Sequence, residues 1–217
     1  MNKSVWSVSA ILFAASSTIA IAQSKGATYI TDEEVKTVNA TPGVDRTIKV
    51  IDIGPENFSV GVIHRGASAA GRGAGAAPAS GAAAAGRGAA PQAEPCGEQA
   101  ATPPTGGTPG AIAHDQQTEG YLIISGGGTL VTGGKIVNGR RSGPESDVTK
   151  ILNGPSCSGA AVGADVVKKV VKTGDIIIIP AGVPHGWTDI TDHVDYLSFR
   201  PSARVLEAGY THPSIKK

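Results

Sequence analysis

The sequence predicts an all-β protein, either a barrel or a sandwich, preceded by one short helix. Two observations lead to this prediction. Beyond residue 120 the chain contains short segments rich in β-branched residues, and turns rich in glycine and proline separate them. No run with the period of an amphipathic helix occurs among these segments. Several short strands between such turns are typical of all-β barrels and sandwiches.

Residues 1–22 are interpreted as a secretory signal peptide. After Lys3 the chain carries no charge from Val5 to Ala22, and it ends in a small-x-small cleavage pattern. The alternative is an uncleaved membrane anchor, because the apolar run is nearly long enough to span a bilayer. With cleavage, the protein is expected to be exported, either to the periplasm or outside the cell, and to have no membrane partner.

Charge and length limit the classes of function. The formal net charge of +1 falls to zero without the leader, which carries Lys3 and no acidic residue. We therefore expect no nucleic-acid partner. A chain of 217 residues fits one domain with a sizeable core. We assign an N-terminal helix and lead-in to residues 23–46, a barrel to residues 47–206 and a C-terminal tail to residues 207–217.

A short helix and a β-hairpin are predicted at the start of this domain. Thr31 is followed three residues later by Glu34, which is the pattern of a capping box, so a helix is expected over about residues 32–39. Thr47–Ile53 and Phe58–His64 are predicted to be two strands joined by a turn that contains glycine and proline.

Residues 67–110 are predicted to form a disordered insert in the barrel. No Val, Leu, Ile, Met or aromatic residue occurs between Ile63 and Ile112, and residues 67–95 are mostly Ala, Gly and Pro. Such a segment cannot bury enough apolar surface to offset the entropy lost on ordering. Its two AAGRGA repeats are interpreted as a solvated spacer rather than as a ligand site.

The rest of the barrel is predicted from five strand-like segments. These are Tyr121–Ser125, Thr129–Thr132, Val166–Val171, Asp175–Ile179 and Tyr196–Phe199. The four consecutive isoleucines that end at Ile179 predict a buried strand in the barrel wall. Residues 139–163 are predicted to be loop, and they include Cys157.

We expect a disulfide between the two cysteines, Cys96 and Cys157. In an exported protein an even pair of cysteines indicates a possible bridge. It would close a loop of about 60 residues and contribute roughly 4 kcal/mol through chain entropy. The alternative is two unrelated free thiols, because spacing does not show that the two positions meet. Neither cysteine has a neighbouring Cys or His partner that would indicate a metal site.

Two histidines and one carboxylate carry the chemistry that the sequence predicts. Glu119 shares a strand face with Tyr121 and Ile123, so its charge points toward a core, where it must be paired or bound to metal. His185 follows a turn that Pro180, Gly182 and Pro184 make rigid. Together with His114, these side chains would form a 2-His-1-carboxylate set, which leaves metal positions open for water, substrate or oxygen.

The segments around these residues resemble the two signature motifs of the cupin superfamily. The first motif contains glycines, histidines and a glutamate at fixed spacings. In this chain Gly106, His114, Glu119 and Gly126 stand at those spacings. The second motif is matched by Gly174, Pro180, Gly182 and His185, with Asp189 in place of an asparagine. The one other departure is Ile112, which occupies the position of the first histidine in the first motif. The resemblance covers residues from about 47 to 200, without the insert.

This resemblance implies a fold and a ligand set. The fold is a double-stranded β-helix, or small jelly-roll barrel, and a homodimer is a family expectation. The implied metal ligands are His114, Glu119 and His185, with Gln116 or His64 as a fourth contact. The metal would be Fe(II) or Mn(II), and Zn(II) or Ni(II) would also suit the site. Alternatively, the pocket is degenerate and His114 simply pairs with Glu119.

Three further residues are assigned to the pocket. Tyr121 and Trp187 are expected to line its wall, although either would also fit an ordinary core. Arg200 is expected to meet an anionic substrate at the barrel mouth, or else to be a solvated strand end.

Three hypotheses about function remain open. The first is a metal-dependent enzyme of the oxygenase or isomerase type that acts on a small molecule. The second is a non-catalytic cupin that binds a small ligand or sugar. The third is a structural or cell-surface protein whose insert makes the contacts.

Overall fold

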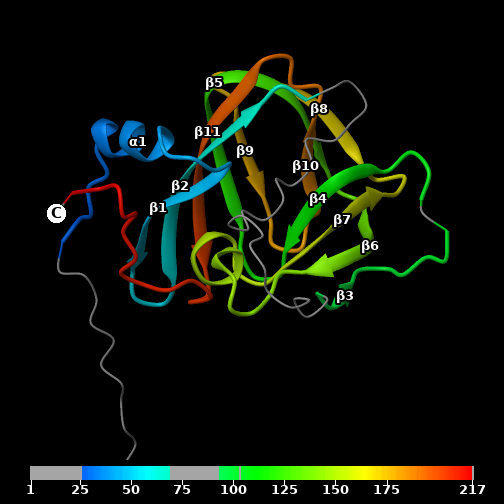
Figure 1. Ribbon diagram of the computed structural model, residues 1–217, viewed down its shortest axis with the longest axis horizontal. Helices are drawn as coiled ribbons and strands as arrows, with labels where there is room; N and C mark the ends of the chain where they lie inside the picture. Colours follow the sequence, from blue (N-terminus) through cyan, green and yellow to red (C-terminus); the bar gives the residue numbers. More distant parts are fainter. Residues whose placement is uncertain (1–25, 69–92, 103, 217) are drawn as a thin grey trace, which may run out of the picture.

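A computed structural model describes residues 26–68, 93–102 and 104–216 (Figure 1). The predicted signal peptide and residues 69–92 of the predicted insert lie outside the described residues. Within the described ranges, no helix has the length and apolar character needed to cross a membrane.

The described chain forms helix α1 (Asp32–Asn39), a short π-helical turn η1 (Val148–Leu152) and strands that all pair antiparallel. The strands are β1 (Asp45–Asp52), β2 (Asn57–Gly66), β3 (Pro95–Cys96), β4 (Thr108–His114), β5 (Glu119–Thr132), β6 (Lys135–Arg141), β7 (Ser156–Val162), β8 (Val167–Lys172), β9 (Ile176–Ile179), β10 (His185–Thr188) and β11 (His193–Ser202).

The strands form a jelly roll in which β5 belongs to both sheets. The first half of β5 pairs with β9 and β11, and β11 continues through β2 to β1. Its second half pairs with β8 and β10, and β10 continues through β4, β7 and β6 to β3. The predicted all-β jelly roll with a short N-terminal helix is confirmed (Figure 1).

Helix α1 begins where the capping box predicts. The Thr31 side chain accepts a hydrogen bond from the Glu34 amide at 3.2 Å, and the Glu34 carboxylate accepts one from the Thr31 amide at 3.0 Å. The helix packs Val38 into a cluster with Val60 and Val62 of β2. It therefore covers the outer face of the β1–β2 hairpin and leaves the opposite face for the barrel interior.

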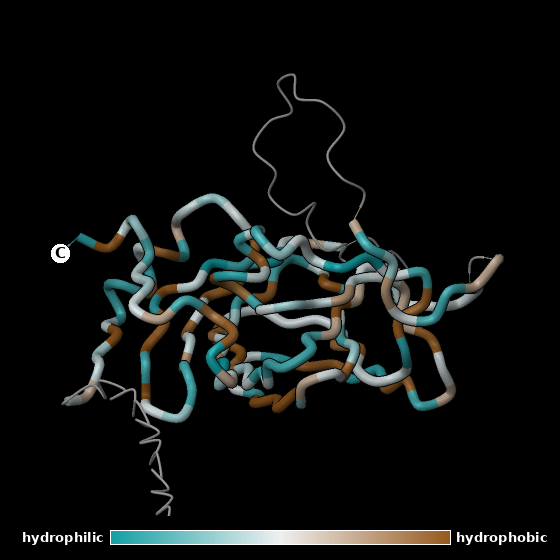
Figure 2. Tube along the Cα trace, turned by 90° about the horizontal axis from the view of Figure 1, so that it is seen from below, coloured by the Kyte–Doolittle hydropathy of each residue, from teal (hydrophilic) through white to brown (hydrophobic). Residues whose placement is uncertain are grey.

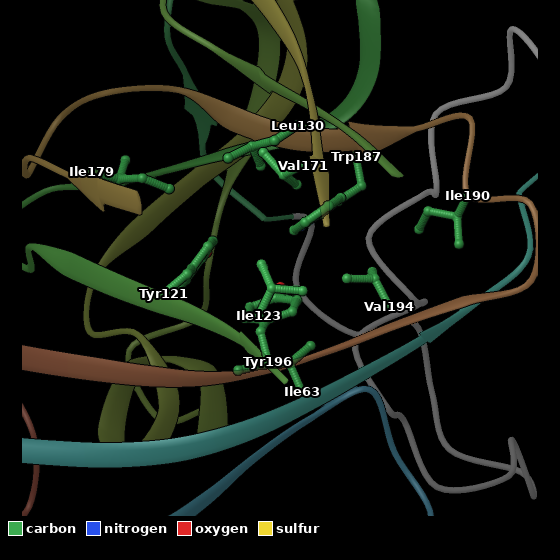
Figure 3. Packing of buried hydrophobic residues seen from close by; sticks show 10 residues of the cluster. All are labelled: Ile63, Tyr121, Ile123, Leu130, Val171, Ile179, Trp187, Ile190, Val194 and Tyr196. Atoms are coloured by element: carbon green, nitrogen blue, oxygen red, sulfur yellow. The ribbon is translucent and has the colours of Figure 1, made fainter. Parts of the chain in front are cut away.

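Alternation along the strands separates this outer cluster from the core. On β2, Val60 and Val62 belong to the cluster under α1, whereas Ile63 packs with Tyr121 and Tyr196 in the barrel interior (Figure 3). Hydrophobic and hydrophilic stretches follow one another along the chain (Figure 2), as expected for strands with two different faces.

Strand β9 is only half buried, so the prediction of four buried isoleucines is wrong. Ile179 is 2% exposed, but Ile176 is 71% exposed and Ile178 is 66% exposed. Among the described strands, β9 pairs only with β5, and the alternate side chains of this edge strand point away from the core. A run of identical apolar residues carries no alternation, so it could not reveal the uncovered face.

A matched pair of substitutions tests this difference in burial. Ile179→Val is expected to lower the free energy of unfolding by about 0.5–1.5 kcal/mol, because it removes a buried methylene group. Ile178→Val is expected to change it by less than about 0.5 kcal/mol, because the side chain is already in water. Urea unfolding of both variants checks the prediction, and equal losses would contradict it.

Two segments predicted without regular structure contain strands. β3 and the start of β4 lie inside the predicted insert of residues 67–110, and all of β7 lies inside the predicted loop of residues 139–163. β7 is built mainly from Ala, Gly and Ser, and β3 and the start of β4 contain proline, so these strands give little strand signal. A small residue is also required on the neighbouring strand β6, because a Cβ on Gly139 would lie 2.7 Å from the Cys157 sulfur.

The disulfide between Cys96 and Cys157 joins β3 to β7, with 5.9 Å between the two Cα atoms.

At the other end of the chain, the predicted tail runs along β1. The Val50 amide donates to the Tyr210 carbonyl at 3.0 Å, and the Gly209 amide donates to the Val50 carbonyl at 2.9 Å.

Candidate metal centre

The fold brings His114, Glu119 and His185 together inside the barrel. His114 ends β4, Glu119 begins β5 and His185 begins β10, which pairs with both of those strands. Their ligand atoms all lie within 4.8 Å of one another. The three side chains are 2%, 1% and 4% exposed, so the group is shielded from bulk water.

The rigid turn before His185 is tied directly to the other motif. Gly182 has a positive φ of 80°, which favours glycine, and its amide donates to the His114 carbonyl at 2.7 Å. His185 then enters β10 opposite Ile112 of β4. The turn therefore sets the position of one histidine relative to the other through backbone contacts.

The hydrogen bonds of His185 assign its tautomer. Its Nδ1 lies 3.0 Å from the Val183 carbonyl oxygen. Because a carbonyl can only accept, Nδ1 carries the proton. In the neutral ring Nε2 then bears a lone pair, and this atom lies 3.1 Å from Glu119 Oε2.

His114 is held in the same tautomer by Ser156. Its Nδ1 lies 2.8 Å from Ser156 Oγ, and that hydroxyl donates its proton to the Gly154 carbonyl at 2.9 Å. His114 Nδ1 must therefore be the donor, which leaves a lone pair on Nε2. Nε2 lies 3.3 Å from Glu119 Oε2 and 3.1 Å from Asn153 Nδ2. Burial lowers the pKa of His114 below its ordinary value, although Glu119 opposes the shift, and this favours the neutral ring.

Glu119 is oriented by donors on both of its oxygens. Oε1 accepts from Arg200 Nε at 2.8 Å and from Ser198 Oγ at 3.2 Å, and Oε2 accepts from the Tyr121 hydroxyl at 2.5 Å. Burial alone would raise the pKa of Glu119, but the charge of the Arg200 guanidinium outweighs it and holds the pKa well below its usual range. The side chain is therefore a carboxylate.

This donor set fits a divalent metal ion. Two imidazole lone pairs and one carboxylate oxygen converge, and they repel one another unless a cation lies between them. Each imidazole donates its other ring N–H to an oxygen, as metal-ligating histidines almost always do. A simple His114–Glu119 pair would need a proton on His114 Nε2, and the lowered pKa of His114 opposes that.

The other residues assigned from the sequence lie in different places. Tyr121, Trp187 and Arg200 line a cavity of about 120 Å³ together with the three candidate ligands. Arg200 is 1% exposed and is not a solvated strand end. Its guanidinium holds Glu119 and also donates to Asp45 Oδ2 at 2.6 Å, so it supports the site rather than meeting a ligand.

The two residues predicted as a fourth ligand do not reach the centre. Gln116 is exposed, in the turn between β4 and β5. His64 is on the outer face of β2, where its ring binds Asp195 at 2.6 Å. That prediction is corrected because the next residue, Arg65, is the one that lines the cavity.

Sequence reasoning also missed Asn153 and Ser156, which contact His114. Both lie in the segment that was predicted as loop, next to η1, where no motif signals a role. The Leu152 carbonyl of η1 accepts a hydrogen bond from Arg200 Nη1 at 2.9 Å, which ties this turn to the site. π-helical turns are frequent at functional sites, but they have no clear sequence signature.

Comparisons with known proteins found similarity among solved structures. No family model and no curated protein matches the chain. A protein from Neisseria meningitidis is 7% identical, with a TM-score of 0.35 over 80% of this chain and 100% of that one. A cupin protein from Bacteroides fragilis is 17% identical, with a TM-score of 0.29 over 74% of this chain and 78% of that one.

An oxalate oxidase solved in complex with glycolate is 11% identical, with a TM-score of 0.32 over 76% of this chain and 55% of that one. The topology and the site define an all-β jelly-roll protein with a buried His-Glu-His group. The fold implied by its two cupin-like motifs is confirmed.

Proposed function

We propose that this protein binds one divalent metal ion through His114, Glu119 and His185, and that it binds or transforms a small molecule in the adjoining cavity. The observation that carries the proposal is the convergence of two imidazole Nε2 lone pairs on one ionised carboxylate. Fe(II) or Mn(II) is expected for such a set, and Zn(II) or Ni(II) would also suit it.

Three protein ligands leave coordination positions open. A bound metal would supply Lewis acidity and would orient a ligand. The chain prepares the site in three ways: Ser156 and the Val183 carbonyl orient the rings, Tyr121 holds the carboxylate, and Ile112 presents an apolar wall where the family motif has a histidine. Ile112 therefore reduces the number of protein ligands and leaves room for one more exogenous ligand.

A second candidate function is non-catalytic binding of a small ligand. Ile112 favours it, because loss of one motif histidine weakens the metal site while the enclosed cavity remains. We further propose that the protein is exported. The predicted leader supports this, and a disulfide between Cys96 and Cys157 is typical of proteins that fold in an oxidising compartment.

Metal analysis tests the proposed function. The protein without residues 1–22 is reconstituted with Fe(II), Mn(II), Zn(II) or Ni(II), dialysed, and its metal content is measured by mass spectrometry. We expect about one ion per chain for at least one metal. His185→Ala and Glu119→Gln are expected to weaken binding by more than about 100-fold, since changes in groups that only support the ligands already cost 10–100-fold.

His64→Ala is the matched control, because His64 is a histidine on the outer face and should not affect the metal content. Circular dichroism establishes that each variant is folded. A wild-type protein that retains none of the four metals would overturn the metal proposal. Small-ligand binding that persists in metal-free His185→Ala protein would favour the non-catalytic function.

A further inference from the structure

We propose that the cavity beside the candidate metal centre binds a small carboxylate through the guanidinium of Arg65. This inference rests on the proposed function for the location of the metal, and it adds the chemical class of the ligand. Arg65 lines the same cavity as His114, Glu119 and His185.

Arg65 has hydrogen-bond donors to spare. Its Nε donates to the Tyr196 hydroxyl at 3.2 Å, and within the described residues its guanidinium has no other hydrogen bond or ion pair. Arg46, on the neighbouring strand β1, is different, because its terminal nitrogens bind Asn39 and the carbonyls of Thr41 and Gly43. Each nitrogen of the Arg200 guanidinium also has a partner, namely Glu119, the Leu152 carbonyl or Asp45. Arg65 is thus the arginine of the cavity that remains available to a ligand.

Two other donors of the cavity lack an acceptor in the described chain. The Tyr196 hydroxyl accepts from Arg65, and no described group accepts its own proton. The indole N–H of Trp187 is buried without a partner, although Trp187 is only 1% exposed. Buried donors are nearly always paired, so the lining favours a ligand rich in acceptor atoms. Among the fully buried side-chain atoms of the lining, within the described residues, the unpaired acceptor is Asp45 Oδ1.

The net charge of the cavity lining favours an anion over other ligands that are rich in acceptor atoms. In the lining, the two arginines Arg65 and Arg200 balance the two carboxylates of Asp45 and Glu119. A divalent metal ion would therefore leave two positive charges in a shielded cavity. The planar guanidinium matches a carboxylate through two parallel hydrogen bonds.

Volume limits the size of the ligand. The cavity of about 120 Å³ has room for roughly four water molecules, at about 30 Å³ each. This is well below the roughly 300–1,000 Å³ of sites for drug-sized ligands. A carboxylic acid of a few carbon atoms fits these limits, whereas an oligosaccharide does not.

Calorimetric titration of the folded protein tests the inference. Acetate, propionate and neutral acetamide are titrated into protein loaded with Zn(II) and into metal-free protein. We expect a carboxylate to bind the loaded protein at least tenfold more tightly than acetamide. Arg65→Gln is expected to weaken carboxylate binding at least tenfold while the zinc content stays unchanged, and Arg65→Lys is expected to restore part of the affinity.

Arg140→Gln is the matched control, since Arg140 is an exposed arginine of β6, away from the cavity. Equal carboxylate binding by wild type and Arg65→Gln would overturn the inference, and so would tighter binding of inorganic phosphate than of every carboxylate. If the protein holds no metal but still loses carboxylate binding on Arg65→Gln, the proposed metal function fails while the Arg65 subsite stands.

Discussion

Replacing Arg200 with methionine is expected to lower the free energy of unfolding by about 3–5 kcal/mol, since breaking a buried ion pair leaves an uncompensated charge. Arg200 is 1% exposed and joins Glu119, at 2.8 Å, to Asp45, at 2.6 Å. Methionine fills much of the same volume but donates no hydrogen bond. Both carboxylates would then lose their cationic partner inside the barrel.

Urea unfolding, followed by the fluorescence of Trp187, measures this loss. Trp187 is the only tryptophan left after removal of the leader, and it is buried next to the site. Arg204→Gln is the control, because Arg204 pairs with Asp52 near the surface and such pairs contribute less than about 1 kcal/mol. Equal losses in the two variants would show that the buried network does not stabilise the fold as described.

Removing the disulfide is expected to have an effect of similar size. The double variant Cys96→Ser, Cys157→Ser should lose up to about 4 kcal/mol of unfolding free energy, because the bridge restrains a long loop in the unfolded chain. The two cysteines are 61 residues apart, and the loop between them contains β4, β5 and β6. The bridge also anchors β3, which is only two residues long.

Reductant provides an independent measurement of the same effect. Unfolding of the wild type in dithiothreitol should match that of the double variant, and dithiothreitol should not change the double variant itself. A wild-type midpoint that reductant leaves unchanged would contradict the prediction.

Much of the site could be predicted because strand geometry is simple. Alternation placed Glu119, Tyr121 and Ile123 on one face, and all three are buried on the interior side of β5. Alternation also places His64 and Arg65 on opposite faces of β2. The sequence does not show which of these faces is the interior one, because β2 is apolar on both, with Val60 and Val62 under α1 and Ile63 in the core.

Other features had no signal along the chain. β7 is built from small residues, so it looked like a loop, yet it carries Ser156, which orients His114. Ile176 and Ile178 looked like core residues, but exposure depends on whether another element covers an edge strand. Propensity describes a residue and its neighbours in sequence, whereas burial depends on distant elements.

The sequence by itself determined the all-β class, the capped N-terminal helix and the identity of the three candidate ligands, because these depend on local spacing, alternation and turn chemistry. Only the tertiary structure decided that both imidazoles present Nε2 to Glu119, that Arg200 supports the carboxylate, and that Arg65 rather than His64 faces the cavity. Hydrogen-bond partners as far as 131 residues apart set those features, and no local pattern in the chain encodes them.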